Sequence, residues 1–164
     1  MQKNGESCEV GIKRRNILSK YFVLTSNSVM SQDILVEEFG NYSYKITSNG
    51  IVTSTISISC GFKIFGKEFV VSPNSKLFVV KSSDGDFIEI EPLENDKWFT
   101  FTTKLTVRLS NDDVVMVNYR GGWLNNEGLH IECAQFCNNK EPEYLADILT
   151  LCLAFIHRYD SQTD

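Results

Sequence analysis

The most constraining feature of this sequence is an apolar helix pattern near its C-terminal end, over residues 142–159. Pro142 suits the first helical position, Glu143 suits the positive end of the helix dipole, and His157 suits its negative end. No wide polar face lies between these ends, because most positions are apolar: Leu145, Ala146, Ile148, Leu149, Leu151, Cys152, Leu153, Ala154, Phe155 and Ile156. A helix that is apolar nearly all round must be surrounded on all sides, by lipid or by protein.

Protein is the better candidate for what surrounds this helix. The stretch without charged residues covers only residues 148–156, whereas a membrane-spanning helix needs about 20 apolar residues. We therefore expect no transmembrane segment, and we predict that the rest of the chain wraps the helix. This expectation constrains the fold far more than it constrains the function.

The composition favours one compact, β-rich domain. A chain of 164 residues with 42% hydrophobic content is close to the usual size of a domain and can bury a substantial core. The aromatic and β-branched residues that favour strands are abundant. The five cysteines are odd in number and scattered, which argues against a disulfide framework. No apolar stretch follows the charges at the start of the chain, so we expect no secretory signal peptide and a cytoplasmic protein.

Short strand patterns separated by turn residues fill most of the chain before the helix. The alternation is clear in residues 42–47 and again from Val52 onward, and Asn49-Gly50 between them is a strong hairpin signal. The expected strands cover residues 21–25, 33–38, 42–47, 52–59, 67–71, 77–81, 87–91, 98–102, 104–109, 114–119 and 129–135. Because no linker divides them, we expect a single domain over residues 17–160.

So many short strands in one domain must form a sandwich or a closed barrel, and closure also removes exposed strand edges. An apolar helix with no polar face fits as the plug of a barrel. We therefore predict a mostly β fold: an antiparallel closed barrel of about twelve short strands around a hydrophobic C-terminal helix. Alternation of apolar and polar residues in several strands agrees with half-buried antiparallel pairing.

Three segments carry a family resemblance: ILVEEFG at residues 34–40 with YSYKI at 42–46, GLHIE at 128–132, and YLADILTLCLA at 144–154. Together they resemble the tubby C-terminal superfamily, which includes tubby-like, LURP-one-related and phospholipid scramblase-like proteins. The resemblance implies a twelve-stranded barrel closed around its C-terminal helix, with no enzyme active site. Tubby-like members bind phosphoinositide headgroups, and scramblase-like members associate with membranes.

The binding residues of that superfamily are not carried over to this chain. The Lys and Arg pattern of the phosphoinositide site does not line up here, and the cysteine-rich palmitoylation stretch of scramblases is missing. A second resemblance involves KRR at residues 13–15 and KYFVLT at 20–25, which is similar to the opening of a pleckstrin-homology domain. Such a domain has fewer strands than are expected here and a Trp in its final helix, which this chain lacks.

Charge is distributed unevenly along the chain. The net charge is −5, but residues 1–20 hold five basic and two acidic residues, so this segment is +3 and the remainder is −8. An acidic body makes nucleic acid an unlikely partner, since that affinity depends on many phosphate contacts. We expect residues 1–16 to form a basic N-terminal arm, for which a plain solvated segment is the alternative.

Two groups of residues are candidates for contact with an anionic membrane. The basic cluster is expected to supply the contacts to lipid or anions: Lys13, Arg14, Arg15 and Lys20. Trp123 and Leu124 follow a Gly-Gly pair and could form an apolar anchor for a membrane or a protein partner, although a Trp in the core is the commoner case.

Catalytic and metal-binding patterns are poor. Neither His130 nor His157 lies near a nucleophile in a recognisable motif. His130, Cys133 and Cys137 have a spacing that suggests a metal site, but a strand would point the first two to opposite faces. We expect no catalytic residues, no metal and no cofactor, and we expect the cysteines to be free thiols.

The sequence therefore leaves three functional hypotheses. The first is a non-enzymatic tubby-like barrel that associates peripherally with anionic membranes containing phosphoinositides and tethers or adapts partners. The second is a protein-interaction barrel with no lipid role, beside which a pleckstrin-homology-like adaptor is an alternative. The third is an enzyme with a hidden site, which is disfavoured because the residue constellations it would need are missing.

Overall fold

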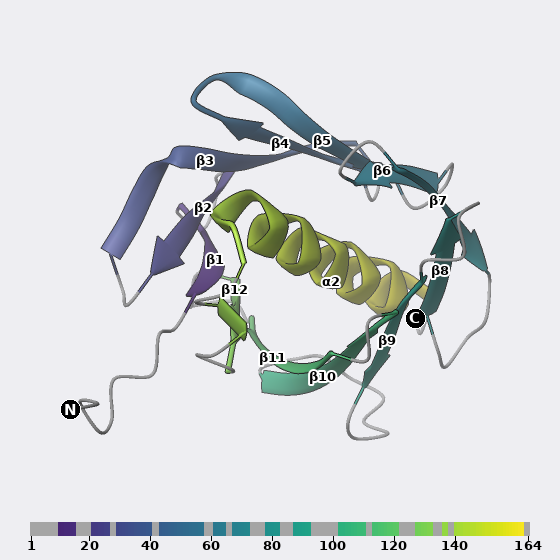
Figure 1. Cartoon of the computed structure of the whole chain (residues 1–164). Helices are drawn as coiled ribbons and strands as arrows, with labels where there is room; N and C mark the ends of the chain where they lie inside the picture. The colour runs from purple at the N-terminus through teal and green to yellow at the C-terminus, as the bar shows by residue number, and fades with distance from the viewer. Residues whose placement is uncertain are drawn as a thin grey trace.

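The architecture was established from a computed structural model (Figure 1). The structure describes residues 10–15, 21–26, 29–40, 43–57, 61–64, 67–72, 78–82, 87–92, 102–110, 113–121, 127–132, 136–137 and 140–162. The elements within these ranges are β1 Val10–Arg14, β2 Tyr21–Ser26, β3 Val29–Gly40, β4 Ser43–Ser48, β5 Ile51–Ser57, β6 Gly61–Ile64, β7 Lys67–Ser72, β8 Phe78–Ser82, β9 Phe87–Pro92, β10 Thr102–Leu109, β11 Val114–Arg120, β12 Gly128–Ile131 and the helix α2 Pro142–Gln162.

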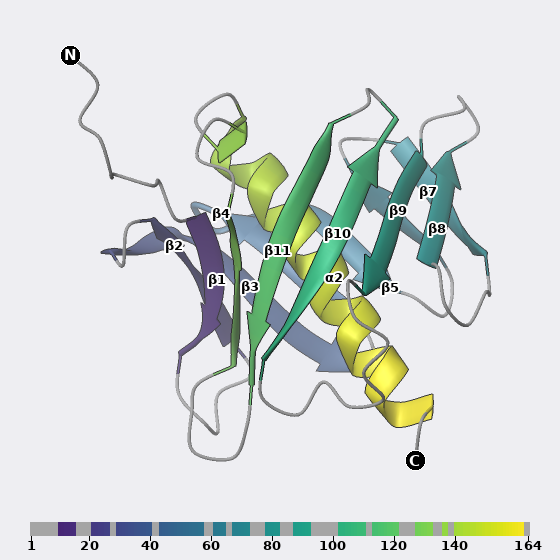
Figure 2. The same ribbon diagram turned by 90° about the horizontal axis from the view of Figure 1, so that it is seen from below.

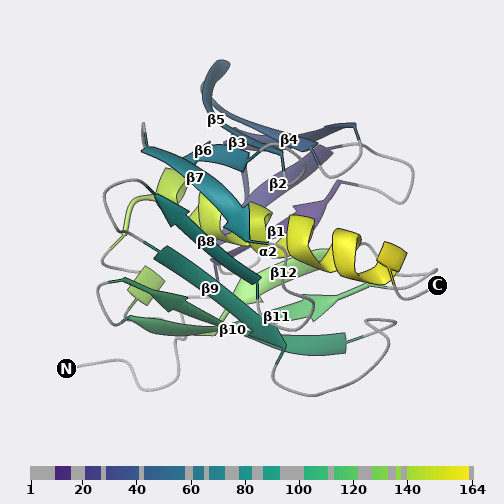
Figure 3. The same ribbon diagram turned by 90° about the vertical axis from the view of Figure 1, so that its right-hand side faces the viewer.

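The strands form an antiparallel sheet packed against a single C-terminal helix, as expected. Each strand from β2 to β11 pairs with the strands before and after it in sequence. β1 pairs with β2 on one side and with β12 on the other. Figure 2 shows β10 and β11 crossing one side of α2, and Figure 3 shows α2 between β2–β5 above and β9–β11 below.

Most of the expected strands coincide with observed ones within a few residues, but β1 and β6 were not expected. β6 has only four residues, so it is too short to give a clear alternating pattern. β1 occupies residues that were assigned to a basic arm, and the expected arm boundary at residue 16 is therefore corrected. The expected strand at 98–102 lies outside the described residues except for Thr102, which begins β10.

The helix is buried as its apolar pattern predicts. Every residue from 145 to 156 is buried, and Leu145, Ile148, Leu149 and Ile156 are at most 2% exposed. The helix contacts β1, β3, β4, β5 and β12, and Figure 1 shows it running through the middle of the strands. It ends at Gln162, three residues beyond the expected end. Among the described residues, no helix is both long enough and apolar enough to cross a membrane.

The predicted hairpin at Asn49-Gly50 joins β4 to β5. Both residues have positive φ, 52° at Asn49 and 81° at Gly50. Positive φ at both central positions is the signature of a type I′ turn, whose twist matches that of the flanking strands. The strand register confirms a two-residue loop, because Ser48 lies opposite Ile51.

The described cysteines, Cys137 and Cys152, are both buried and free. Burial raises the pKa of the Cys152 thiol, so this side chain stays protonated and behaves as a small apolar group. Cys8, Cys60 and Cys133 lie outside the described residues, and with Cys133 the metal spacing considered above is also left untested. Among the described residues, no group of His, Cys, Asp or Glu side chains could hold a metal ion.

One carboxyl group interrupts the apolar interior. Asp147 on α2 is 2% exposed, and its Oδ1 has no hydrogen-bond partner among the described residues. Burial raises the pKa of Asp147 to about 7, and the negative charge of Glu143 adds to the rise, while a hydrogen bond with Ser54 lowers it. A carboxyl group of this kind is held protonated below neutral pH.

Replacing Asp147 by Asn should stabilise the protein in mildly alkaline solution. The pKa of Asp147 rises from 3.8 to about 7 on folding, so stability is lost as the pH rises towards 7, by roughly 4 kcal/mol in total. Asp147→Asn should remove this loss. Urea unfolding at pH 5 and pH 8 measures the part of this loss that falls above pH 5, about 3 kcal/mol. The control is Asp113→Asn on the turn before β11, where the side chain is 44% exposed. An equal loss between the two pH values in the wild type and in Asp147→Asn would contradict the assignment.

Candidate functional site

The alternation of side chains along β1 separates the three cations that were expected to act together. Ile12 points into the core and is 1% exposed, Lys13 is exposed, and Arg14 is half-buried. Arg15, which follows the strand, is exposed. Because neighbouring residues of a strand point to opposite faces, Arg14 turns inward while Lys13 turns outward. The site therefore has an internal part and an external part.

Arg14 is held in the internal part by two carboxylates. Its Nη2 atom lies 2.7 Å from Oε1 of Glu127 and 3.4 Å from Oε2 of Glu38, and its guanidinium lies 4.5 Å from the centre of the Phe22 ring. The side chain is 18% exposed. Arg14 is therefore an internal ion-pair partner and not an open cation on the surface, so it is removed from the candidate lipid contacts. Lys20, Trp123 and Leu124 lie outside the described residues.

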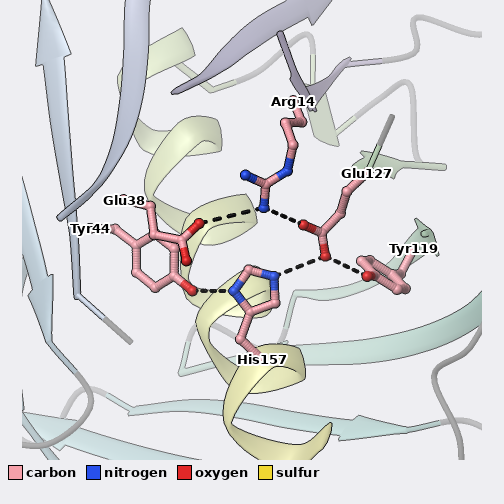
Figure 4. Close-up of polar contacts among 6 residues, drawn as sticks. All are labelled: Arg14, Glu38, Tyr44, Tyr119, Glu127 and His157. Carbon is pink, nitrogen blue, oxygen red and sulfur yellow. Dashed lines mark hydrogen bonds and ion pairs between the residues drawn. The ribbon is translucent and has the colours of Figure 1, made fainter. Parts of the chain in front are cut away.

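His157 connects the helix to the same carboxylate (Figure 4). Its Nε2 lies 2.9 Å from Oε2 of Glu127, and its Nδ1 lies 2.5 Å from the hydroxyl of Tyr44. The hydroxyl of Tyr119 also donates to Oε2 of Glu127. We call this cluster the internal network: Arg14, Glu38, Tyr44, Tyr119, Glu127 and His157. It fastens the last third of α2 to β1, β3, β4 and β11 and to the residue before β12.

Glu127 is the centre of the internal network. Burial would raise its pKa, but hydrogen bonds from His157, Tyr119 and Arg14, together with the positive charge of His157, outweigh burial and lower the pKa to about 2. The carboxylate is therefore ionised throughout the physiological pH range. An ionised carboxylate that accepts several charged or polar hydrogen bonds is a strong local anchor.

The internal network contains the hydrogen-bonded groups of a proton relay, and the hydroxyl at its start belongs to a buried residue. Tyr44, His157 and Glu127 are connected by hydrogen bonds in the order hydroxyl, imidazole, carboxylate, which is the order of a general-base triad. However, Tyr44 is 0% exposed, so its hydroxyl cannot meet a reacting molecule. The contacts of the network connect α2 to four strands, which stabilises the packing of the helix against them.

Sequence reasoning missed most of the internal network. His157 was considered alone, and Glu38, Tyr44, Tyr119 and Glu127 were not singled out. One signal was available. Leu129 and Ile131 are buried, and residue 127 lies two and four positions before them, so its side chain is expected to point inward as theirs do. A carboxylate at an inward position requires a partner, which marks Glu127 as a residue of interest.

The external part of the site consists of three exposed cations at the same end of the sheet. Lys13 and Arg120 lie opposite Gly128 from its two sides, and Arg15 follows the end of β1. None of these three forms an ion pair with another described residue. By contrast, Lys104 pairs with Glu132 at 3.5 Å and Lys140 pairs with Asp113 at 3.9 Å.

Two exposed aromatic side chains lie at this end as well. Tyr21 begins β2 and is 40% exposed, and Phe39 near the end of β3 is 48% exposed. The Nζ atom of Lys45 lies 5.3 Å from the centre of the Phe39 ring. The acidic residue Glu37 on β3 lies opposite Tyr21 on β2 and opposite Lys45 on β4. We call this surface the cationic end, comprising Lys13, Arg15, Tyr21, Phe39, Lys45 and Arg120.

The opposite end of the sheet, where α2 begins, has a different character. Its exposed apolar side chains are Ile51, Val52 and Val114, which are 70%, 51% and 54% exposed. The acidic residues Asp113 and Glu143 lie there and bind Lys140 and Ser48. Arg108, opposite Val114, is also exposed and forms no ion pair with another described residue. Among the described residues, the cationic end therefore differs from the opposite end in combining several such cations with exposed aromatic rings.

Comparison of the chain with protein-family models, with curated proteins and with solved structures found no match. The candidate site therefore depends on its own geometry.

Proposed function

We propose that this protein is a non-enzymatic, tubby-like β-barrel that docks peripherally on anionic membranes, including those that contain phosphoinositides, through the cationic end. In this proposal the strands close into one barrel with α2 as its plug. The pairing of β1 with both β2 and β12 supports closure, and the buried surface of α2 on all sides supports its role as a plug. A barrel bound at one end leaves its other end available to tether or adapt a protein partner in the cytoplasm.

The observation that carries this proposal is the combination of cations and aromatic rings on one exposed end. Lys and Arg gain about 1 kcal/mol each near an anionic membrane surface. Aromatic rings favour the interface between headgroups and acyl chains. Lys13, Arg15 and Arg120 supply the charges, and Tyr21 and Phe39 supply the rings. The ammonium group of Lys45 lies over the ring of Phe39, so this part of the surface presents a cation next to an aromatic ring.

Three charges alone give weak binding, so a second, apolar contact is required. Tyr21 and Phe39 are partly exposed and can provide it. Trp123 and Leu124, which lie outside the described residues, stay a prediction for a further anchor.

Sedimentation with anionic vesicles tests the proposal. We expect binding at low ionic strength that weakens steeply as salt is added, because the contact is mainly electrostatic. Changing Lys13→Glu and Arg15→Glu together should abolish sedimentation. The matched control is the pair Lys104→Glu and Arg108→Glu, which makes the same change in net charge on β10 and should bind like the wild type apart from a modest general loss.

Three results would count against the proposal. Binding that persists at high salt would exclude an electrostatic dock, and equal losses in the two double variants would show that only net charge matters. The absence of binding to any anionic vesicle would favour the protein-interaction hypothesis. The exposed Ile51, Val52 and Val114 at the opposite end would then be the surface to examine.

A further inference from the structure

The first part of β3 extends beyond the strand that covers the rest of its edge. β3 pairs with β2 through residues 29–31 and again through residues 35–37, whereas its pairing with β4 begins only at Ile34, opposite Ser48. Figure 1 shows the first part of β3 continuing past the tip of the β4–β5 hairpin, with β2 beside it. On the side of β4, residues 29–32 therefore have no neighbouring strand in the described part of the chain. We call this side of residues 29–32 the free edge.

The hydrogen bonding of β2 shows which backbone groups of β3 point to the free edge. The amide of Arg15 donates to the carbonyl oxygen of Tyr21 at 2.9 Å, so the backbone groups of Tyr21 point to β1. Because these directions alternate along a strand, those of Thr25 also point to β1 and not to β3. Met30 lies opposite Thr25, so the amide and carbonyl groups of Met30 point away from β2 and towards the free edge.

The sequence of the free edge lacks the features that usually protect a strand edge. Natural proteins block such edges with charged residues, especially lysine, or with proline. Residues 21–32 contain no charged residue and no proline. A bulge in β3 at residues 32–34, which have no partner on β2, lies next to the free edge and leaves the regular pairing of residues 29–31 intact. The free edge is therefore open to a further strand.

The surroundings of the free edge are acidic and apolar. Asp33, the next residue of β3, has an exposed side chain. Its carbonyl oxygen accepts from the amide of Asn49 at 2.8 Å, which places the β4–β5 turn at the end of the free edge. Just after this turn, Ile51 and Val52 are 70% and 51% exposed. Glu143 at the start of α2 lies at the same end, where it accepts a hydrogen bond from the last residue of β4.

We propose that the free edge binds an extended segment of a protein partner, rich in basic and apolar residues, as an added strand. An open sheet edge supplies main-chain hydrogen bonds to such a segment, and neighbouring side chains select its sequence. Asp33 and Glu143 favour basic residues, and Ile51 and Val52 favour apolar residues next to the turn. The inference is independent of membrane docking, because the free edge lies at the start of β3, whereas Phe39 of the cationic end lies near its other end.

A second copy of the chain fits the free edge less well than a single extended segment. Four residues of strand span about 13 Å, and β4 covers β3 from Ile34 onward in each copy. Two copies could therefore pair through this short stretch only, whereas a stable dimer buries at least about 1,200 Å² in total. The net charge of −5 also opposes self-association and attracts a basic segment.

Titration with synthetic peptides tests the proposal. In the probe peptide valine alternates with lysine and threonine, and the comparison peptide has glutamate in place of each lysine. We expect the probe to shift the amide signals of Val29, Met30 and Ile51. It should bind about tenfold more tightly than the comparison peptide, because Asp33 repels glutamate. Asp33→Asn should reduce that difference, whereas Asp113→Asn, which makes the same change in net charge at the turn before β11, should retain it.

Methylation of the probe backbone tests strand addition separately from charge. Methyl groups on alternate backbone nitrogens remove the donors along one edge of an extended peptide and leave those of the other edge intact. One of the two methylated peptides should lose binding, and the other should retain it. Met30→Pro should also lose binding while keeping the fold, because the amide of Met30 points away from β2 and proline is tolerated at such an edge position. Circular dichroism checks the fold of this variant, and the methylated peptides need no variant at all.

Several results would overturn the proposal. Equal binding of the two methylated peptides would exclude strand addition, and equal binding of the lysine and glutamate peptides would exclude selection by acidic side chains. The absence of saturable binding, or amide shifts centred away from residues 29–32, would remove the free edge as the docking surface. Dimerisation with rising protein concentration that shifts the same amides and is reversed by the probe would make a second copy the occupant.

Discussion

Replacing Leu149 by Asp is expected to abolish the folded state. Leu149 is 0% exposed in the middle of α2, between apolar side chains of the helix and of the strands. A charge at this position would be buried without a partner and would leave the volume of the leucine side chain unfilled. Such a change costs at least several kcal/mol, which is comparable to the whole stability of a domain of this size. Far-ultraviolet circular dichroism and urea unfolding should show no cooperative transition.

The matched control is Ile51→Asp. Ile51 is 70% exposed at the start of β5, so an aspartate there stays in water. Its free energy of unfolding should change by less than about 1 kcal/mol. A folded Leu149→Asp protein with an unchanged melting temperature would contradict the burial of α2.

The second large effect is expected at Glu127. Its pKa falls from 4.5 to about 2 on folding, so its contribution to stability is fully present above pH 4.5 and is lost as the pH falls through 2. Glu127→Gln should therefore destabilise the protein by about 3 kcal/mol at pH 7, because Arg14 loses its closest counter-charge and His157 loses its ionised hydrogen-bond partner. The difference from the wild type should shrink steadily as the pH approaches 2.

Glu132→Gln is the control for this prediction. Glu132 also interacts with a cation and an amide, but its side chain is 40% exposed, so the interactions are screened by solvent. Unfolding curves at pH 7 and pH 3 for the two variants should differ clearly. Equal stability of Glu127→Gln and the wild type at pH 7 would show that the internal network does not hold α2 to the strands.

The fold was predictable where local patterns are strong. The apolar helix had no polar face to expose, so it had to be surrounded, and the alternation in residues 42–47 together with Asn49-Gly50 predicted the β4–β5 hairpin. β1 was missed because Lys13, Arg14 and Arg15 gave its end the composition of a solvated arm. Once β1 is recognised, the burial of Val10 and Ile12 shows that the side chain of Arg14, two residues further on, also points inward.

The site was less predictable because it depends on strand register. Glu127 and His157 are far apart in the chain, and their contact requires a particular rotation of α2 relative to β12. Arg120 joins Lys13 only because both lie opposite Gly128. Neither relation has a local signature in the sequence. The uneven charge of the sequence indicated that the basic segment is important. Only the alternation of side chains along β1 shows that Arg14 points inward to an ion pair, while Lys13 and Arg15 stay on the surface.

The most direct test of membrane docking asks which end of the molecule meets the lipid. Nuclear magnetic resonance spectra of the wild type would be recorded with anionic bicelles carrying a nitroxide-labelled headgroup, which broadens the amide signals of residues near the membrane. The proposal predicts broadening at Lys13, Tyr21 and Phe39, with Gly50, Ile51 and Val114 at the opposite end unaffected. Broadening centred on Gly50, Ile51 and Val114, or an equal effect at both ends, would contradict it.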